Sequence, residues 1–186
     1  MKNNSINANM IRNSHGSLAE FGPALLLFFV FLLVPAFAFL RLGVSTAAVY
    51  FVVDRAADAA AKSPYYDSAW SRANEVIHDL ANLPIARFAG LNAKDVRQVT
   101  LYVDEHVTAT ETVNVLTREQ LLQKTICPEV NSYEYEVQSS FTVQPLLPGC
   151  ALPWLGRIPY LCASAPITVR AVRVVEYPNG LQLSAK

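Results

Sequence analysis

The sequence predicts an α+β protein, with a long N-terminal transmembrane helix followed by a small domain of one further helix and an antiparallel sheet of about four strands. Three observations support this prediction. The chain has one long apolar run near its start, an alanine-rich stretch that extends this run, and apolar–polar alternation in its second half. At 186 residues the chain has room for one domain and an anchor.

The charges of the chain indicate no nucleic-acid partner. Fifteen basic and fifteen acidic side chains cancel, and neither sign forms a block. Charged residues make up only 16% of the chain, whereas 52% are hydrophobic. Part of this apolar excess is local, because Phe21–Leu40 holds twenty residues and no charge. About 20 apolar residues suffice to span a bilayer, so membrane lipid is a predicted partner.

The apolar run divides the chain into three predicted parts. Residues 1–20 are expected to be a cytoplasmic leader-like segment, residues 21–40 a single transmembrane helix, and residues 64–186 an extracytoplasmic domain. Lys2 and Arg12 before the run give a weak positive-inside bias for this orientation.

A signal peptide is the alternative reading of the apolar run. Ala36-Phe37-Ala38 resembles the small-residue site at which such peptides are cleaved. Cleavage after Ala38 would release a secreted or periplasmic soluble binding module. The apolar stretch continues beyond this site, however, and from Phe21 to Val53 Arg41 is the only charged residue. The sequence therefore favours the anchor.

The helix is expected to continue past the membrane, to about residue 62. Alanines are frequent between residues 47 and 61 and have the highest helix propensity. Ser63 precedes Pro64, and a residue before proline is disfavoured in a helix. Pro35 lies inside the predicted transmembrane segment and is expected to kink it, because its ring removes one backbone hydrogen bond.

A second helix is predicted after Pro64, with Asp67 as its cap and its end near Leu83-Pro84. Its apolar stripe comprises Ala69, Ala73, Val76, Ile77 and Leu80.

Four segments are expected to form strands: residues 99–103, 111–116, 133–143 and 167–177. Apolar and polar residues alternate most regularly in the third segment, which is typical of a strand with one buried and one solvent-exposed face. Glu134 or Glu136 is expected to pair across strands with Arg170 or Arg173.

Between the last two strands, residues 145–163 are rich in proline and in large apolar side chains. This segment is expected to be a loop that meets the rest of the domain, a neighbouring subunit or the membrane. Cys150 and Cys162 bracket it. In an exported domain they would form a disulfide worth roughly 2–4 kcal/mol, with Cys127 left over. The alternative is three reduced, buried thiols in a cytosolic protein.

No catalytic motif appears in the sequence. It contains neither a nucleophile elbow, nor a glycine-rich phosphate loop, nor a zinc-binding H-E-x-x-H. Asp104, Glu105 and His106 suggest a metal site, but a solvated turn is the preferred interpretation. We therefore expect no enzyme activity, no metal and no cofactor.

The stretch Gly16-Ser17-Leu18-Ala19-Glu20-Phe21 resembles the processing region of type IV pilins and of TadE/TadG-like pseudopilins. In those families a glycine precedes the cleaved bond and a glutamate follows before an apolar helix. The resemblance implies processing between Gly16 and Ser17 by a prepilin peptidase. It also implies that Glu20 contacts the new N-terminus of a neighbouring subunit. The spacing departs by one residue, since Glu20 is the fourth residue from Ser17 and the family pattern has the fifth.

A second region, far along the chain, also resembles TadE-like proteins. Val137–Gly149 is a strand running into Pro-Leu-Leu-Pro-Gly, and Ile167–Glu176 is a β-branched strand ending in Arg-x-x-Glu. The resemblance implies a minor pilin or pseudopilin of the bacterial inner membrane, single-pass, with its domain periplasmic or extracellular. Other pilin-like subunits and the pilus assembly machinery would be its partners. A bitopic envelope protein with no pilus connection is a further alternative.

Overall fold

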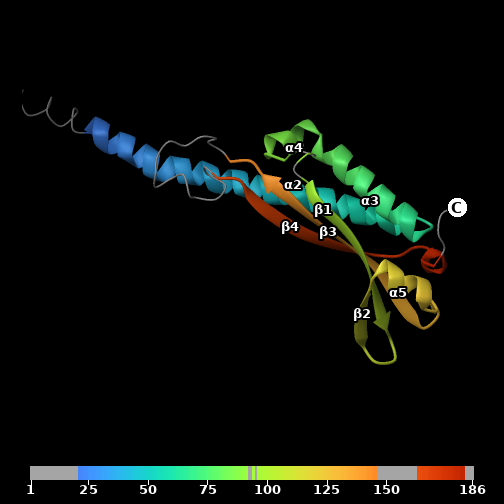
Figure 1. Ribbon diagram of the computed structural model, residues 1–186. Coiled ribbons are helices and arrows are strands. Elements are labelled where there is room, and N and C mark those ends of the chain that lie inside the picture. Colours follow the sequence, from blue (N-terminus) through green and yellow to red (C-terminus); the bar gives the residue numbers. More distant parts are fainter. Residues whose placement is uncertain (1–20, 92–93, 95, 146–162, 183–186) are drawn as a thin grey trace, which may run out of the picture. The chain divides into compact units, whose positions relative to one another are not determined.

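The computed structural model describes residues 21–91, 94, 96–145 and 163–182, and Figure 1 shows their arrangement into elements. The chain divides into two compact units, Met1–Leu40 and Arg41–Lys186. The described elements form an α+β fold with a long apolar N-terminal helix, a four-stranded antiparallel sheet and further helices. This architecture confirms the predicted α+β class, with its long apolar N-terminal helix and its antiparallel sheet of four strands. That the N-terminal helix spans a membrane stays a prediction.

The N-terminal helix extends over Phe21–Ala61, close to the predicted end. Residues 21–28 are α-helical, η1 (Phe29–Leu33) is a π-helical turn, and α2 spans Val34–Ala61. Pro35 follows η1 and has no amide hydrogen to donate to the carbonyl four residues earlier. A π-helical turn is one way in which a helix accommodates such an interruption. The expected kink itself stays a prediction.

The second helix, α3 (Tyr66–Ala81), begins one residue before the predicted cap. Asp67 therefore lies in its first turn, and the prediction of a cap at this position is wrong. Instead, the hydroxyl of Ser68 accepts a hydrogen bond from the backbone N–H of Tyr65 at 3.2 Å. The predicted apolar stripe does face the core, with Ala69, Ala73 and Ile77 fully buried.

Beyond the single helix that the sequence predicted, the described residues of the domain contain a 3₁₀ turn, η3 (Pro178–Gly180), and two short α-helices. The two helices are α4 (Pro84–Phe88) and α5 (Arg118–Gln123). Pro84 was expected to mark the end of a helix, but it occupies the start of α4. Proline fits a first helical position because the amide there has no intrahelical partner.

All four predicted strands are present in one antiparallel sheet with the order β2-β1-β3-β4. Their bounds are β1 (Val96–Val107), β2 (Thr112–Leu116), β3 (Asn131–Val143) and β4 (Ala165–Val174). In the central strand β3, alternate side chains from Tyr133 to Val143 are buried, as the alternation predicted.

The core lies between one face of the sheet and the buried stripes of α2 and α3 (Figure 1). The buried stripe of α2 consists of small residues: Val49, Val52, Val53, Ala56, Ala57 and Ala60. Small side chains let the helix approach the sheet closely, and the larger Tyr135 and Phe141 of β3 fill the opposite side.

Two ion pairs attach β4 to its neighbours. Arg170 pairs with Glu136 at 3.5 Å, which confirms one of the expected cross-strand contacts. The two residues are diagonal neighbours, because Gln138 lies directly opposite Arg170. Arg173 instead forms an ion pair with Asp54 of α2, and thereby links the edge strand to the helix.

Candidate functional site

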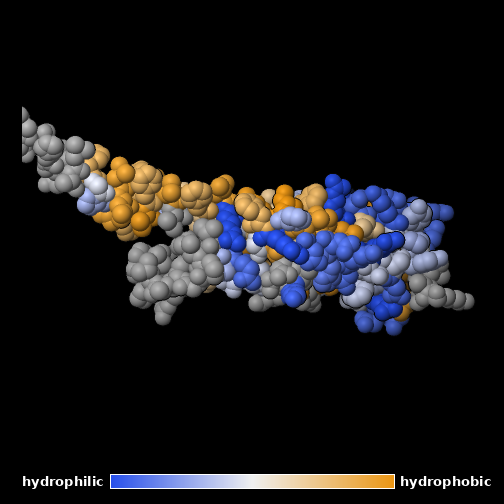
Figure 2. Space-filling view, turned by 90° about the horizontal axis from the view of Figure 1, so that it is seen from above, coloured by the Kyte–Doolittle hydropathy of each residue, from blue (hydrophilic) through white to orange (hydrophobic). Residues whose placement is uncertain are grey.

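The most exposed apolar surface of the described chain is the N-terminal helix before Arg41. Its large apolar side chains are exposed, with values from 43% for Leu33 to 73% for Phe39. Figure 2 shows this segment as a nearly continuous hydrophobic surface. Within the described residues, Phe21–Ala61 is the one helix long and apolar enough to cross a membrane, and none of its most apolar window is buried. A core helix of a soluble domain would be mostly buried.

Most of the predicted site residues lie outside the described residues. This holds for Gly16, Ser17 and Glu20, and for Cys150 and Cys162, so their predicted roles stay predictions. Pro35 is described and lies in α2.

The leftover cysteine, Cys127, lies just before β3. It is exposed and forms no disulfide with any described residue, and its backbone N–H donates a hydrogen bond to the hydroxyl of Tyr133 at 3.1 Å.

Arg41, the first charged residue after the apolar run, connects three segments of the domain. Its guanidinium donates to the carbonyl of Pro145 at 3.1 Å. It also lies over Gly90, whose positive φ of 80° is a conformation that glycine adopts without strain. One turn further along α2, the hydroxyl of Ser45 lies 2.5 Å from the carbonyl oxygen of Ala89, at the end of α4. Arg41 and Ser45 of α2 therefore contact the residues that directly follow α4.

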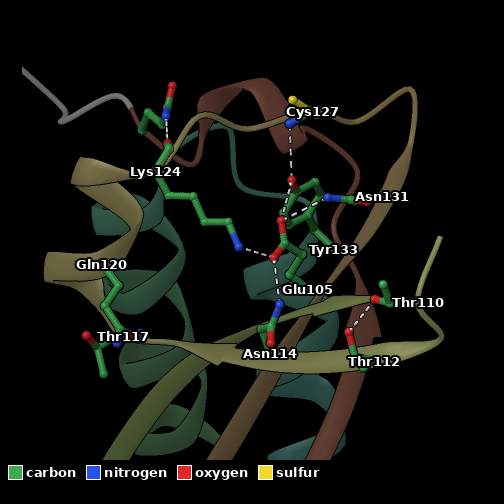
Figure 3. A network of polar contacts seen from close by, with 11 residues as sticks. Glu105, Thr110, Thr112, Asn114, Thr117, Gln120, Lys124, Cys127, Asn131 and Tyr133 are labelled. Carbon is green, nitrogen blue, oxygen red and sulfur yellow. Dashed lines mark hydrogen bonds and ion pairs between the residues drawn. The ribbon is translucent and has the colours of Figure 1, made fainter. Parts of the chain in front are cut away.

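A buried carboxylate, Glu105, forms the centre of a polar network on the core side of β1 (Figure 3). Its side chain is fully buried, and its two oxygens accept from four groups. Asn131 donates at 3.0 Å, Tyr133 at 3.1 Å and Asn114 at 3.3 Å. Lys124, which follows α5, forms an ion pair with it. A buried charge with this many donors is satisfied rather than reactive.

The network lowers the pKa of Glu105. Burial alone would raise this pKa, because it disfavours the charged form. The hydrogen bonds from Lys124, Asn114 and Tyr133 outweigh burial and hold the pKa below its ordinary value. We infer that the network holds α5 and the β1–β2 hairpin to β3.

This network was not expected from the sequence, in which Asp104 to His106 suggested a solvated turn. That interpretation is wrong, because all three residues belong to β1. The alternation of side chains along the strand was the signal that could have revealed the network. Leu101, Val103 and Glu105 share one parity, so the carboxylate of Glu105 had to face the core.

The opposite face of the sheet carries a second polar group. His106 lies 3.1 Å from Glu134, and Asp104 lies directly across from Glu134 in the register. Asp104 is only 8% exposed, and its Oδ1 has no hydrogen-bond partner among the described residues. Burial, followed by the charge of Glu136, raises the pKa of Asp104.

In the described part of the chain, no three His, Cys, Asp or Glu side chains converge as metal ligands would. The sequence hypothesis of a metal site at Asp104 and His106 therefore gains no support.

Comparison with known proteins assigns no family to the chain. No family model, no curated protein and no solved structure matches it.

Proposed function

We propose that the chain is a TadE-like, pilin-like structural or assembly subunit of a Tad-type pilus or related secretion filament. It would be anchored in the inner membrane of a bacterium by residues 21–40, with its domain on the periplasmic or extracellular side. The proposal assigns no catalytic step to the chain. The observation that carries it is the division of one helix, Phe21–Ala61, into an apolar exposed part and a part buried under the sheet.

The two parts of this helix suit the two environments of a pilin-like subunit. Lipid solvates the exposed apolar side chains of residues 21–40 before assembly, and helices of neighbouring subunits replace the lipid afterwards. The buried stripe from Val49 to Ala60 fixes the domain to the same helix. The resemblance of residues 16–21 to a pilin processing region supports the same function.

The alternative, a soluble module released after Ala38, is less consistent with the exposed surface. Such a product would begin with Phe39 and Leu40, which are 73% and 63% exposed. Fractionation followed by mass spectrometry separates the two functions. The proposal predicts a membrane-bound chain that begins at Ser17, whereas the alternative predicts a soluble chain that begins at Phe39.

A matched pair of glycine variants tests the processing step. Gly16→Leu is expected to block cleavage and leave the full leader on the chain. Gly22→Ala is the control, because a methyl group there meets nothing within 4 Å. An intact N-terminus on the unsubstituted chain, together with normal assembly, would remove the processing claim.

The role of Glu20 is tested by assembly. In the membrane, a carboxylate beside the ammonium of a neighbouring subunit offsets the cost of burying either charge alone. Glu20→Gln is therefore expected to impair subunit association, as measured by crosslinking in membranes. Glu75→Gln is the control, since Glu75 lies on the exposed surface of α3 and its side chain is 56% exposed. Unchanged crosslinking of the Glu20 variant would argue against the contact.

A further inference from the structure

We propose that α4 is a membrane-surface contact, in which Leu83, Ile85 and Phe88 insert into the headgroup region of the bilayer spanned by residues 21–40. This inference rests on the proposed function, because it requires the anchor. It goes beyond that function by assigning a lipid-binding role to a part of the folded domain.

The first observation is the exposure of α4. Phe88 is 78% exposed and Ile85 is 70% exposed, the two highest values among the large apolar side chains described after residue 40. Leu83, directly before the helix, is 41% exposed. The residues by which this segment packs on the domain are small, since Ala86 and Ala89 are the buried ones. The segment thus directs its bulky side chains outward.

The second observation is the position of α4 in the domain. The hydroxyl of Ser45 in α2 contacts the carbonyl of Ala89, and Arg41 lies against Gly90. Ser45 follows Leu40 by five residues, which corresponds to a rise of about 7.5 Å along a helix. The headgroup region of one leaflet is about 5–8 Å thick. If the span ends at Leu40, only five residues of α2 separate its end from the residue that contacts Ala89, so chain connectivity alone keeps the end of α4 near the headgroup region.

The third observation is the chemistry of the segment. Arg87 is exposed between Ile85 and Phe88, and an arginine can keep its guanidinium among lipid phosphates while its stem covers apolar surface. Apolar and aromatic side chains next to a basic residue are typical of interfacial helices.

Lipid fits this surface better than a second protein does. A stable protein interface buries about 800 Å² on each partner, whereas α4 and the residue before it offer three large apolar side chains, those of Leu83, Ile85 and Phe88. Lipid contact needs no such area, because the anchor already holds the chain at the membrane.

The test uses the full-length chain in vesicles that contain anionic lipid. Phe88→Trp is introduced together with Trp70→Phe and Trp154→Phe, so that the tryptophan at position 88 is the only one in the chain and all tryptophan emission comes from it. Its fluorescence is measured with lipids brominated either near the glycerol or near the chain ends. The control is Leu122→Trp in the same background, because Leu122 is 58% exposed on α5, at the opposite end of the domain from α4 (Figure 1). Ile85→Trp serves as a second reporter if the first variant does not fold.

The expected result is a loss of emission for the Phe88→Trp variant, greater with the shallow bromines, and no loss for the Leu122→Trp variant. A chain that floats with the vesicles while neither α4 reporter is quenched overturns the membrane contact and leaves the anchor intact. Blue-shifted but unquenched emission also overturns it, since the protein itself would then cover α4. A chain that does not float with the vesicles overturns the proposed function together with this inference.

Discussion

Asp104 and Glu105 are neighbours in β1, yet their carboxyl groups lie on opposite faces of the sheet and their pKa values are shifted in opposite directions. Glu105 faces the core among four hydrogen-bond donors, whereas Asp104 is buried beside other carboxylates, and one of its oxygens has no partner within the described part of the chain. Burial raises both pKa values, and the donors around Glu105 reverse its effect there. The two residues therefore contribute to stability with opposite sign.

Replacing Glu105 by Gln is expected to lower the free energy of unfolding by about 2–3 kcal/mol at pH 7, because Lys124 loses its charged partner. The folded pKa of Glu105 lies below the unfolded value. Its contribution is therefore present above about pH 4.3 and is lost as the pH falls through the folded pKa. Chemical denaturation of the full-length chain in detergent, at pH 7 and pH 4, measures both effects. Equal stability of the two proteins at pH 7 would contradict the role of the network.

Replacing Asp104 by Asn is expected to raise the free energy of unfolding at pH 7, by about 0.5–1 kcal/mol. The folded pKa of Asp104 is raised, so its charged form is disfavoured and stability is lost as the pH rises through the folded pKa. The gain should vanish at low pH, where the carboxyl group is protonated in both states. The same denaturation series measures it, and a loss of stability at pH 7 would refute the assignment.

Gly180 is expected to tolerate no side chain. A Cβ at this position would lie 1.6 Å from the carbonyl oxygen of Pro64, and backbone atoms cannot move aside cheaply. Gly180→Ala should therefore destabilise the domain by about 1–3 kcal/mol. Gly43→Ala is the matched control, since a methyl group there meets nothing within 4 Å and alanine favours a helix by about 0.5–1 kcal/mol. Thermal unfolding that ranked the two variants in the reverse order would contradict this packing.

The two ion pairs of β4 are expected to differ in strength. The nearest charged atoms of Arg170 and Glu136 lie 3.5 Å apart, and these side chains are 69% and 13% exposed. The side chains of Arg173 and Asp54 are in closer contact and are 42% and 24% exposed. Double-mutant cycles should give about 0–0.5 kcal/mol for Arg170 with Glu136 and about 1 kcal/mol for Arg173 with Asp54. Added salt should weaken the first pair more. Equal coupling energies would show that the Arg173–Asp54 pair, which links β4 to α2, is no stronger than the Arg170–Glu136 pair.

The sequence predicted those elements whose signal lies within one segment. Twenty uncharged residues, an alanine-rich continuation and the alternation along Tyr133 to Val143 each indicate structure without reference to the rest of the chain. For this reason the long helix, α3 and all four strands were expected near their observed places.

The remaining features depend on contacts between distant residues or on short signals. The donors to Glu105 include Lys124 and Asn131, 19 and 26 residues away, and no local pattern predicts their convergence. The start of α5 does carry a local signal in the sequence. In the pattern Thr117-x-x-Gln120, the side chain of Gln120 accepts from the backbone N–H of Thr117 at 2.9 Å, which is half of a capping box.

The buried stripe of α2 affects the order in which the protein can fold. Synthesis proceeds from the N-terminus, and Arg173 follows its partner Asp54 by 119 residues. At about 5–20 residues per second, roughly ten seconds separate the two on the ribosome. During this interval the stripe from Val49 to Ala60 has no sheet to cover it. We therefore expect the apolar stripe of the nascent chain to stay uncovered by its own sheet until the last strand has emerged.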